Sequence, residues 1–245
     1  MAPQLFAPST RVSGARRASA LAVAVGIALL VGGCNIRTST QFGQSASHSY
    51  DVDGSVTSLT VDTAGGTIEV DASAQTTTVQ VTETVHYNST EPGAVHTLSG
   101  GVLSLSDPGC ANDKCEVDYV LRVPVAVAAQ LHSDGGEISV HGLSGTLDAQ
   151  SAGGQVTVDS AASRSVTVGS AGGEVSLTFA SVPDSVDVSS AGGSATVALP
   201  TGTSYAVTED AAGGSQKVAV QVDPQSPHTV KVLSAGGDAA VVSAS

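Results

Sequence analysis

Aromatic residues are scarce in this chain of 245 residues, which has no tryptophan, three phenylalanines and four tyrosines. A thick core built on packed rings is therefore excluded, and few side chains are available to stack sugar rings. The apolar residues make up 41% of the chain and are mostly alanine and valine. This composition favours thin, stacked β layers.

Positive charge is also scarce, with 9 lysines and arginines against 22 acidic residues, for a net charge of −13. Three of the cations, Arg11, Arg16 and Arg17, lie in a segment that we expect to be removed, which leaves −16 on the mature chain. Nucleic-acid binding and docking on anionic lipid both depend on cationic side chains, so the balance argues against both. Charged residues are only 13% of the chain, too few for a solvated disordered protein with this much valine.

The chain has no apolar run long enough for a comfortable transmembrane helix of about 20 residues. The stretch 18–33 is free of charge for sixteen residues and follows the three arginines, as in a secretory signal peptide. It ends in Val31-Gly32-Gly33-Cys34, which resembles a bacterial lipobox. The resemblance implies cleavage before Cys34, a diacylglyceryl thioether on its sulfur, and display outside the membrane. The alternative is an ordinary secreted or N-terminally anchored protein with a chance cysteine at this position.

Export by the general secretory route is favoured over the twin-arginine route, because Ser19 and Ala20 stand where apolar residues usually follow the arginine pair. Residues 1–33 are therefore predicted to be a lipoprotein signal peptide. Residues 34–50 are polar and lack apolar periodicity, which predicts a flexible tether. Ordered structure is expected to begin near Tyr50 or Val52.

Two further cysteines, Cys110 and Cys115, enclose four residues. Thiol pairs outside the cytoplasm normally oxidise, so we expect a disulfide that stabilises this loop by about 2 kcal/mol. The alternatives are a metal site or a redox pair. Structural zinc usually takes four ligands, and the redox motif has two residues between its cysteines, so the structural disulfide is favoured.

A Gly-Gly motif recurs through the chain, four times as Ser-Ala-Gly-Gly, beginning at Ser151, Ser170, Ser190 and Ser234. From Gly135 onward the first glycines are 18, 19, 20, 21 and 23 residues apart, a period typical of stacked repeats. We expect these glycines to form sharp corners and to supply positive φ there. The predicted corner residues are Gly65, Gly66, Gly135, Gly136, Gly153, Gly154, Gly172, Gly173, Gly192, Gly193, Gly213, Gly214, Gly236 and Gly237.

Apolar and polar residues alternate on both sides of each corner, as in the run Gln155-Val156-Thr157-Val158. Alternation of this kind predicts strands with one buried face. A single strand–corner–strand unit cannot bury that face alone, so neighbouring units must stack. The prediction is an all-β protein, a β-solenoid or β-roll of about 20-residue repeats over residues 124–245 with a less regular N-terminal β cap over 51–123. A meander of ordinary hairpins is the competing fold.

The phrasing of residues 122–126 (Arg-Val-Pro-Val-Ala), 131–140 and 142–145 (Gly-Leu-Ser-Gly) resembles the "putative adhesin" family of bacterial β-strand-repeat proteins. This domain of unknown function is also called the toastrack domain. The likeness covers roughly residues 55–245. It implies a right-handed β-solenoid on the cell surface and carries no catalytic or ligand residue that could be transferred.

One repeat departs from the pattern, because Glu209 and Gln216 stand where neighbouring repeats place valine. Either a polar site lies inside the column, or a bulge returns both side chains to solvent with Val207 and Val218 still inward. Since burying an unpaired carboxylate is costly, the bulge is favoured. The repeat also lengthens at residues 200–202 and 224–227, and such insertions are expected to form one variable binding edge.

The sequence offers no catalytic, cofactor or metal site that we can defend, and we expect none. The calcium repeat Gly-Gly-x-Gly-x-Asp fails because Val156 occupies its third glycine position. His132 and His141 lack the spacing of metal ligands or of a catalytic triad. Polysaccharide-cleaving enzymes on β-helix scaffolds use convergent carboxylates, for which the candidate rows are Asp148, Asp159 and Asp187, or Glu137 and Glu174.

The leading functional hypothesis is a lipid-anchored, extracytoplasmic, non-catalytic module for structure, adhesion or binding at the cell envelope. Its expected partners are the membrane, through the N-terminal lipid, and an envelope glycan or protein, but no nucleic acid. The alternatives are an envelope polysaccharide-active enzyme on the same scaffold and an accessory sensor for a membrane regulator.

Overall fold

The computed structural model describes residues 42–93, 95–107 and 115–244, which form strands and loops without a helix. The all-β prediction is confirmed. Within these residues no helix could cross a membrane. Cys34, like the whole predicted signal peptide, lies outside the described residues.

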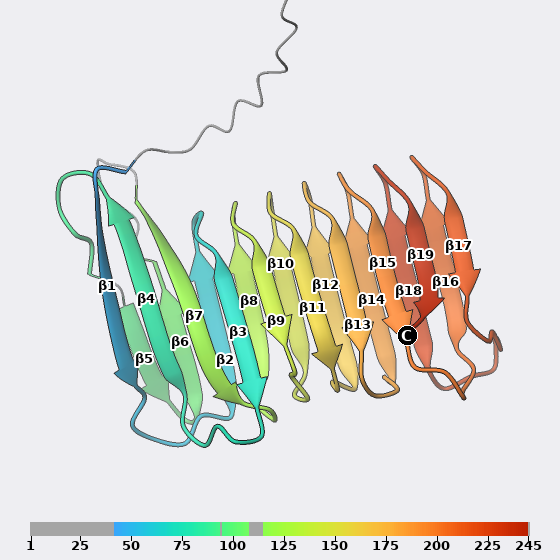
Figure 1. Ribbon diagram of the computed structural model, residues 1–245, viewed down its shortest axis with the longest axis horizontal. Coiled ribbons are helices and arrows are strands. Elements are labelled where there is room, and N and C mark those ends of the chain that lie inside the picture. The colour runs from blue at the N-terminus through green and yellow to red at the C-terminus, as the bar shows by residue number, and fades with distance from the viewer. Residues whose placement is uncertain (1–41, 94, 108–114, 245) are drawn as a thin grey trace, which may run out of the picture. The chain divides into compact units, whose positions relative to one another are not determined.

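The strands form two sheets that face each other along an elongated column (Figure 1). The ten-stranded sheet has the order β1-β4-β7-β3-β9-β11-β13-β15-β19-β17, and the nine-stranded sheet the order β16-β18-β14-β12-β10-β8-β2-β6-β5. The strand bounds are β1 Gln44–Asp51, β2 Ser58–Thr63, β3 Ile68–Ser73, β4 Gln80–Tyr87, β5 Val95–Ser99, β6 Val102–Ser106, β7 Glu116–Pro124, β8 Ala128–Ser133, β9 Ile138–His141, β10 Leu147–Ser151, β11 Val156–Ala161, β12 Ser165–Ser170, β13 Val175–Phe179, β14 Ser185–Ser190, β15 Ala195–Leu199, β16 Ala206–Ala211, β17 Gln216–Ala219, β18 Thr229–Ser234 and β19 Ala239–Ser243.

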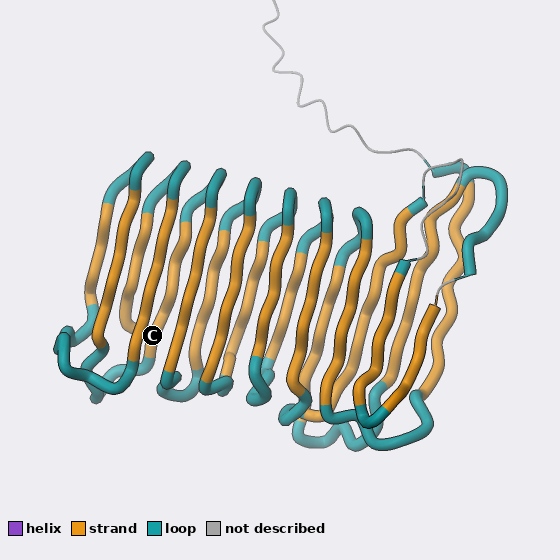
Figure 2. The backbone as a smooth tube through the Cα atoms, turned by 180° about the vertical axis from the view of Figure 1, so that it is seen from behind, coloured by secondary structure: helices purple, strands orange, loops and turns teal. Residues whose placement is uncertain are grey.

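Each repeat, called a rung below, consists of a strand of the nine-stranded sheet, a Gly-Gly corner and a strand of the ten-stranded sheet. Rungs stack through parallel pairing in a constant register, so that Val156 pairs with Ile138 on one side and with Val175 on the other. The inward residues of successive rungs are therefore aligned, as the alternation predicts, and a meander of hairpins is wrong. Figure 2 shows the corners as a regular row along one side of the column.

The core is the narrow space between the two sheets, filled by these aligned inward side chains. Val156, Val175, Val188 and Val197 are fully buried, whereas the residues between them in the strands face solvent. Each such valine contributes about 1.5–3 kcal/mol through burial. Repetition of one small apolar contact thus takes the place of a thick aromatic core.

At the C-terminal end, the order of rungs along the column differs from their order along the chain. The last rung, β18–β19, lies between β14–β15 and the rung β16–β17, which ends the column. The inward residues explain this exchange. Val230 and Val232 of β18 are buried between two neighbours, a position that Glu209 of β16 could occupy only at a high desolvation cost.

For Glu209 and Gln216, neither the polar site inside the column nor the bulge that returns both side chains to solvent is therefore found. The register of β16 against β18 runs without interruption from Ala206 to Ala211, so no bulge is present. Glu209 keeps the inward direction of its position, but at the open end of the column, where its carboxylate accepts a hydrogen bond from the backbone N–H of Lys217. Gln216 is exposed. Val207 and Val218 keep the inward direction of their positions, as expected, but at the open end Val207 is only partly buried and Val218 is 43% exposed.

The N-terminal end is also rearranged. The rung β2–β3 pairs directly with β8–β9, so it belongs to the regular stack although the sequence places residues 51–123 in the cap. The cap consists of β1 and β4–β7, in which β1, β4 and β5 pair antiparallel with their neighbours. The predicted tether is wrong for its last residues, because β1 begins at Gln44; backbone pairing with β4 orders this strand without an apolar pattern.

The corner glycines are required for close stacking and not for backbone conformation. The positive-φ glycines of the described residues lie elsewhere, and no corner glycine is among them, so the expected positive φ is wrong. A Cβ atom on Gly136 would lie 1.9 Å from the carbonyl oxygen of Gly66, and one on Gly173 would lie 2.3 Å from that of Gly154. The second glycine of each corner therefore packs against the backbone of a neighbouring rung, or of β7 for Gly66, without room for a methyl group.

A ladder of buried hydroxyl groups joins the corners. Ser170 Oγ accepts a hydrogen bond from Gly173 N (2.8 Å) within its own corner and donates one to Gly154 O (2.7 Å) in the adjacent rung. The same pair of bonds is made by Ser133, Ser151, Ser190 and Ser234, and Thr63 bonds in the same way to Gly66 N and Val117 O. The terminal rung has Ala211 at this position, so the ladder ends there.

Gly136→Ala is expected to destabilise the protein by about 1–3 kcal/mol, because the new methyl group overlaps the Gly66 carbonyl. Gly135→Ala is the matched control in the same corner. Its Cβ meets Gly65 Cα at 3.7 Å, an ordinary contact, so its effect should stay within about 1 kcal/mol. Urea unfolding of the full chain measures both, and equal losses would refute the stacking explanation.

Ser170→Ala should lower the free energy of unfolding by about 1–3 kcal/mol, because Gly154 O and Gly173 N lose their buried partner. Ser176→Ala, on the outward face of β13, serves as the control and should change stability by less than about 0.5 kcal/mol. The comparison fails if the two variants unfold at the same urea concentration.

Candidate functional site

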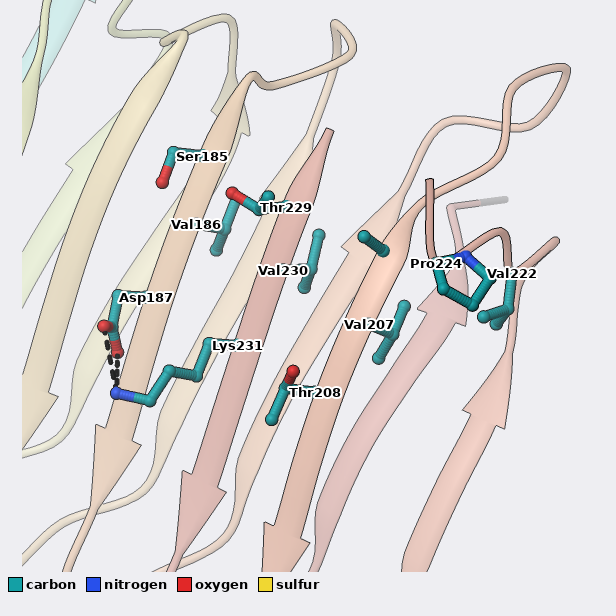
Figure 3. A pocket seen from close by; sticks show the side chains of 11 residues that line it. Ser185, Val186, Asp187, Val207, Thr208, Val222, Pro224, Thr229, Val230 and Lys231 are labelled. Carbon is teal, nitrogen blue, oxygen red and sulfur yellow. Dashed lines mark hydrogen bonds and ion pairs between the residues drawn. The ribbon is translucent and has the colours of Figure 1, made fainter. Parts of the chain in front are cut away.

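A groove of about 420 Å³ lies on the outward face of the nine-stranded sheet, across β14, β18 and β16 (Figure 3). Its volume falls in the range of about 300–1,000 Å³ that is typical of ligand sites. The side chains that define its character are Asp187, Thr208, Val222, Pro224, Thr229 and Lys231.

An ion pair forms the polar part of the groove. Lys231 Nζ lies 3.1 Å from Asp187 Oδ2, and both side chains are about half exposed, at 48% and 47%. Parallel pairing places these residues side by side on β18 and β14, with Thr208 next to Lys231 on β16. An exposed pair of this kind contributes at most about 1 kcal/mol, so little energy is lost when a ligand replaces one partner.

The loop between β17 and β18 supplies an apolar wall. Val222 is 49% exposed, more than any other large apolar residue of the described chain. It lines the groove together with Pro224. Residues 221–223 lie along the start of β16, because Tyr205 N donates to Gln221 O (2.9 Å) and Asp223 N donates to Tyr205 O (3.0 Å). These bonds fix the wall relative to the sheet.

Tyr205 also links the two insertions that the sequence singles out as a binding edge. Its ring is buried, its Oη donates to Pro200 O at 2.8 Å, and burial raises its pKa. Ser226 Oγ donates to Ser204 O at 2.7 Å. Residues 224–227 thus contribute Pro224 to the groove, whereas residues 200–202 lie behind it and do not line it. That this edge binds a ligand stays a prediction.

A second hollow, of about 470 Å³, lies on the same sheet beside the corners. It follows from a missing side chain, because Gly169 stands in the outward row between Gln150 and Ser189. The Gln150 side chain lies over this gap, 2.2 Å from where a Cβ of Gly169 would be. The lining is mainly alanine, serine and glycine and contains no charged pair, so this hollow offers less for recognition than the groove.

The carboxylates considered for glycan cleavage do not converge. Asp148 and Asp187 face outward on one sheet with Thr167 of β12 between them, whereas Asp159 is on the other sheet. Asp187 is paired with Lys231, and Asp148 accepts a hydrogen bond from Gln150 Nε2 at 3.1 Å.

Glu137 and Glu174 belong to different rungs, with the corresponding residue Gln155 in the rung between them. His132, in the nine-stranded sheet, lies 3.2 Å from Asp134. His141 lies 3.1 Å from Asp159, and both of these residues are in the ten-stranded sheet. The described part of the chain contains no group of three or more histidine, cysteine or acidic side chains arranged to hold a metal ion.

A buried polar cluster in the N-terminal cap was not predicted. Glu83 points inward from β4 and is only 7% exposed, with Tyr119 of β7 and His48 of β1 as its direct cross-strand neighbours. Tyr50 of β1 stacks on His96 of β5, with ring centroids 4.7 Å apart. The alternation of Val81, Glu83 and Val85 already contains the signal, because it places Glu83 on the face of the two valines.

The cluster is electrostatically unfavourable. Desolvation raises the pKa of Glu83, although the nearby His96 and His48 oppose this. Desolvation and the Glu83 carboxylate raise the pKa of Tyr50 to about 12, and the same two causes raise the pKa of Tyr119. The Oη atom of Tyr119 has no hydrogen-bond partner among the described residues, whereas that of Tyr50 interacts with the Glu83 carboxylate. A small hollow of about 230 Å³ on β1 and β4 is lined by Tyr50 and its strand neighbours.

Cys115 forms a disulfide. Its expected partner Cys110 lies outside the described residues, so the pairing of the two stays a prediction.

No family model matches the chain, and no curated protein matches it. Solved structures are similar to it. A putative cell adhesion protein from Clostridium sporogenes has 14% identity and a TM-score of 0.48, with 82% of this chain and 100% of that chain covered.

A putative adhesin from Bacteroides fragilis has 18% identity and a TM-score of 0.42, with coverage of 82% and 98%. A putative adhesin from Parabacteroides distasonis has 13% identity and a TM-score of 0.32, with coverage of 81% and 97%.

Glu83→Gln is expected to stabilise the protein at alkaline pH. The folded-state pKa of Glu83 is raised, so the wild type loses stability relative to the variant as pH rises through that pKa. The stability difference should be larger at pH 8 than at pH 4, as measured by urea unfolding at each pH. Glu69→Gln, at an exposed position of β3, is the control and should show no such trend. A constant difference for Glu83→Gln would contradict the desolvation argument.

Proposed function

We propose that this protein is a non-catalytic binding or adhesion module, anchored by a lipid on Cys34 and displayed on the extracytoplasmic side of the membrane. The domain is a β-solenoid whose winding is right-handed, as the family resemblance implies. Residues 1–33 act as the signal peptide, and the short segment between Cys34 and β1 connects the lipid to the column.

The observation that carries this proposal is the register of the two sheets, which is kept from rung to rung with one shift, between Val158 and Ala161 of β11. Outward side chains lie in rows across many strands, as in the row Gln130, Asp148, Thr167, Asp187 and Lys231. A rigid scaffold with long polar faces holds its surface groups at fixed spacings, which suits recognition of an extended partner. The groove across β14, β18 and β16 is the place where this regularity is interrupted by loops, and binding residues are typically found on such loops.

The chemistry of the described residues supports binding over catalysis. The candidate carboxylates are dispersed over two faces, and Asp187 is engaged with Lys231. General acid–base cleavage of a glycan needs two carboxylates directed at one bond. The outward rows instead present hydroxyl, amide and carboxylate groups to solvent, which are suited to reversible hydrogen bonding.

Cys34→Ser tests the anchor. The variant should be released into the medium or accumulate as an unprocessed precursor, since lipid attachment requires the Cys34 sulfur. Fractionation of cells followed by mass spectrometry of the N-terminus measures both outcomes. Ser39→Ala, in the same segment, is the control and should remain in the membrane fraction with its lipid. If Cys34→Ser stays membrane-bound at the wild-type mass, the anchor proposal is wrong.

Binding itself is tested by retention of the full chain on purified cell-envelope polymers and on membrane extracts. Retention without turnover of the bound polymer is the expected result. Release of shortened glycan fragments would instead establish a polysaccharide-active enzyme.

A further inference from the structure

The groove borders a sheet edge that is only partly covered. β16 pairs with β18 on one side, and on its other side only Tyr205, just before the strand, pairs with residues 221–223. Backbone groups alternate in direction along a strand. Val207 and Glu209 therefore direct their N–H and C=O groups to the same side as Tyr205, where no further strand of the described chain follows.

The chain itself shows that this edge accepts an added strand. Tyr205 and Val222 form an isolated parallel bridge, with hydrogen bonds of 2.9 and 3.0 Å on either side of Tyr205. This bridge covers the first position of the edge, and the loop then turns away, because Gln225 N, the next donor in line for the pairing, donates instead to Asp223 Oδ1 at 2.9 Å. The remaining edge of β16 has the same geometry and is free to continue it.

We propose that an extended, positively charged segment of a partner protein adds as a strand to the free edge of β16, beside the groove. This inference rests on the proposed function, because it takes the domain to be a binding module, and it names the site and the chemistry of the partner. Main-chain hydrogen bonds provide affinity in this mode of recognition, and alternate side chains provide specificity.

The acidic side chains near the free edge of β16 favour a partner segment that is basic. Asp210 and Asp223 are exposed at this end of the column, and Glu209 adds a third carboxylate. Of the two lysines there, Lys231 is paired with Asp187, and Lys217 of β17 is one cation against three carboxylates, so the edge is acidic overall. The net charge of the chain, −13, also attracts a basic segment over longer distances.

The apolar wall supplies the second element of recognition. Val222 and Pro224 stand beside the start of the free edge, with almost half of the Val222 side chain exposed. An added strand would place every second side chain on the outward face beside Thr208, within reach of this wall. A segment that alternates small apolar and basic or polar residues fits both features.

A second copy of this chain fits the edge less well than a single strand does. Stacking of another rung would enclose Glu209, whose carboxylate points inward at the open end and is bonded to Lys217 N. Inward-pointing charges at a sheet edge are a device that blocks edge-to-edge association of whole sheets. A lone strand alongside β16 leaves this carboxylate at the open end of the column.

The test uses the full chain and three synthetic peptides in fluorescence anisotropy at low and physiological salt. The first peptide alternates valine and threonine over six residues and has a lysine at each end. The second replaces both lysines with glutamate. The third keeps the lysines and carries N-methyl groups on alternate amides, which removes the donors that an added strand needs.

Two variants locate the site. Asp210→Lys should weaken binding of the lysine peptide by about three- to tenfold through the reversed charge next to the edge. Asp148→Lys is the matched control: both aspartates face outward from the same sheet, and each accepts a hydrogen bond from a glutamine side chain, Gln216 to Asp210 and Gln150 to Asp148. It should leave binding within about twofold.

The proposal is supported if the lysine peptide binds, the N-methylated and glutamate peptides bind at least about tenfold more weakly, and only Asp210→Lys reduces affinity. It is overturned if no peptide binds, if N-methylation has no effect, or if both variants change affinity equally. Concentration-dependent self-association of the full chain that Asp210→Lys abolishes would overturn it in favour of a second copy. Envelope retention of the full chain without peptide binding would refute this inference alone and leave the proposed function in place.

Discussion

The architecture depends on one repeated interaction, the buried serine hydroxyl that joins two neighbouring corners. Each hydroxyl satisfies a backbone N–H in its own corner and a backbone C=O in the next rung, as Ser151 does with Gly154 N and Gly136 O. This geometry requires that the corners approach to contact distance, which in turn requires glycine at the second corner position. The strand register follows, because two corners held together leave their flanking strands no freedom to slide by one residue and reverse their faces.

The ends of the column show what happens when this repeated unit must stop. The rung with an alanine in place of the ladder serine and a glutamate in place of an inward valine is placed last in space, although it is not last in the chain. A more apolar rung, β18–β19, occupies the enclosed position before it. At the other end, antiparallel strands and an inward Glu83 close the column. Both ends therefore carry an inward carboxylate, which a continuous stack of rungs could not accommodate.

The sequence was sufficient to predict the strands, their inward valines and the positions of the corners, because these depend on local alternation and a short period. It was insufficient for the order of the rungs, because β16–β17 and β18–β19 have the same strand–corner–strand pattern, and their order depends on whether Glu209 or Val232 is the residue that tolerates enclosure. The role of the corner glycines was misjudged, since a Gly-Gly pair allows either positive φ or close approach and only stacking distinguishes them. Glu83 was overlooked although its alternation with Val81 and Val85 was readable. The groove depends on Val222 folding back against Tyr205, a contact between a loop and a strand edge that no periodic pattern encodes.

The enclosed position of β18–β19 also affects how the column responds to mechanical load. In a stack that follows chain order, tension on the C-terminus separates the outermost rung, one hydrogen bond at a time. Here the last rung in the chain, β18–β19, is paired with a neighbour on each side. Tension therefore acts on two sets of strand pairings together and largely parallel to the strands. Tension applied at the end of β19 would therefore meet more resistance than the same tension applied to a rung at the end of the column.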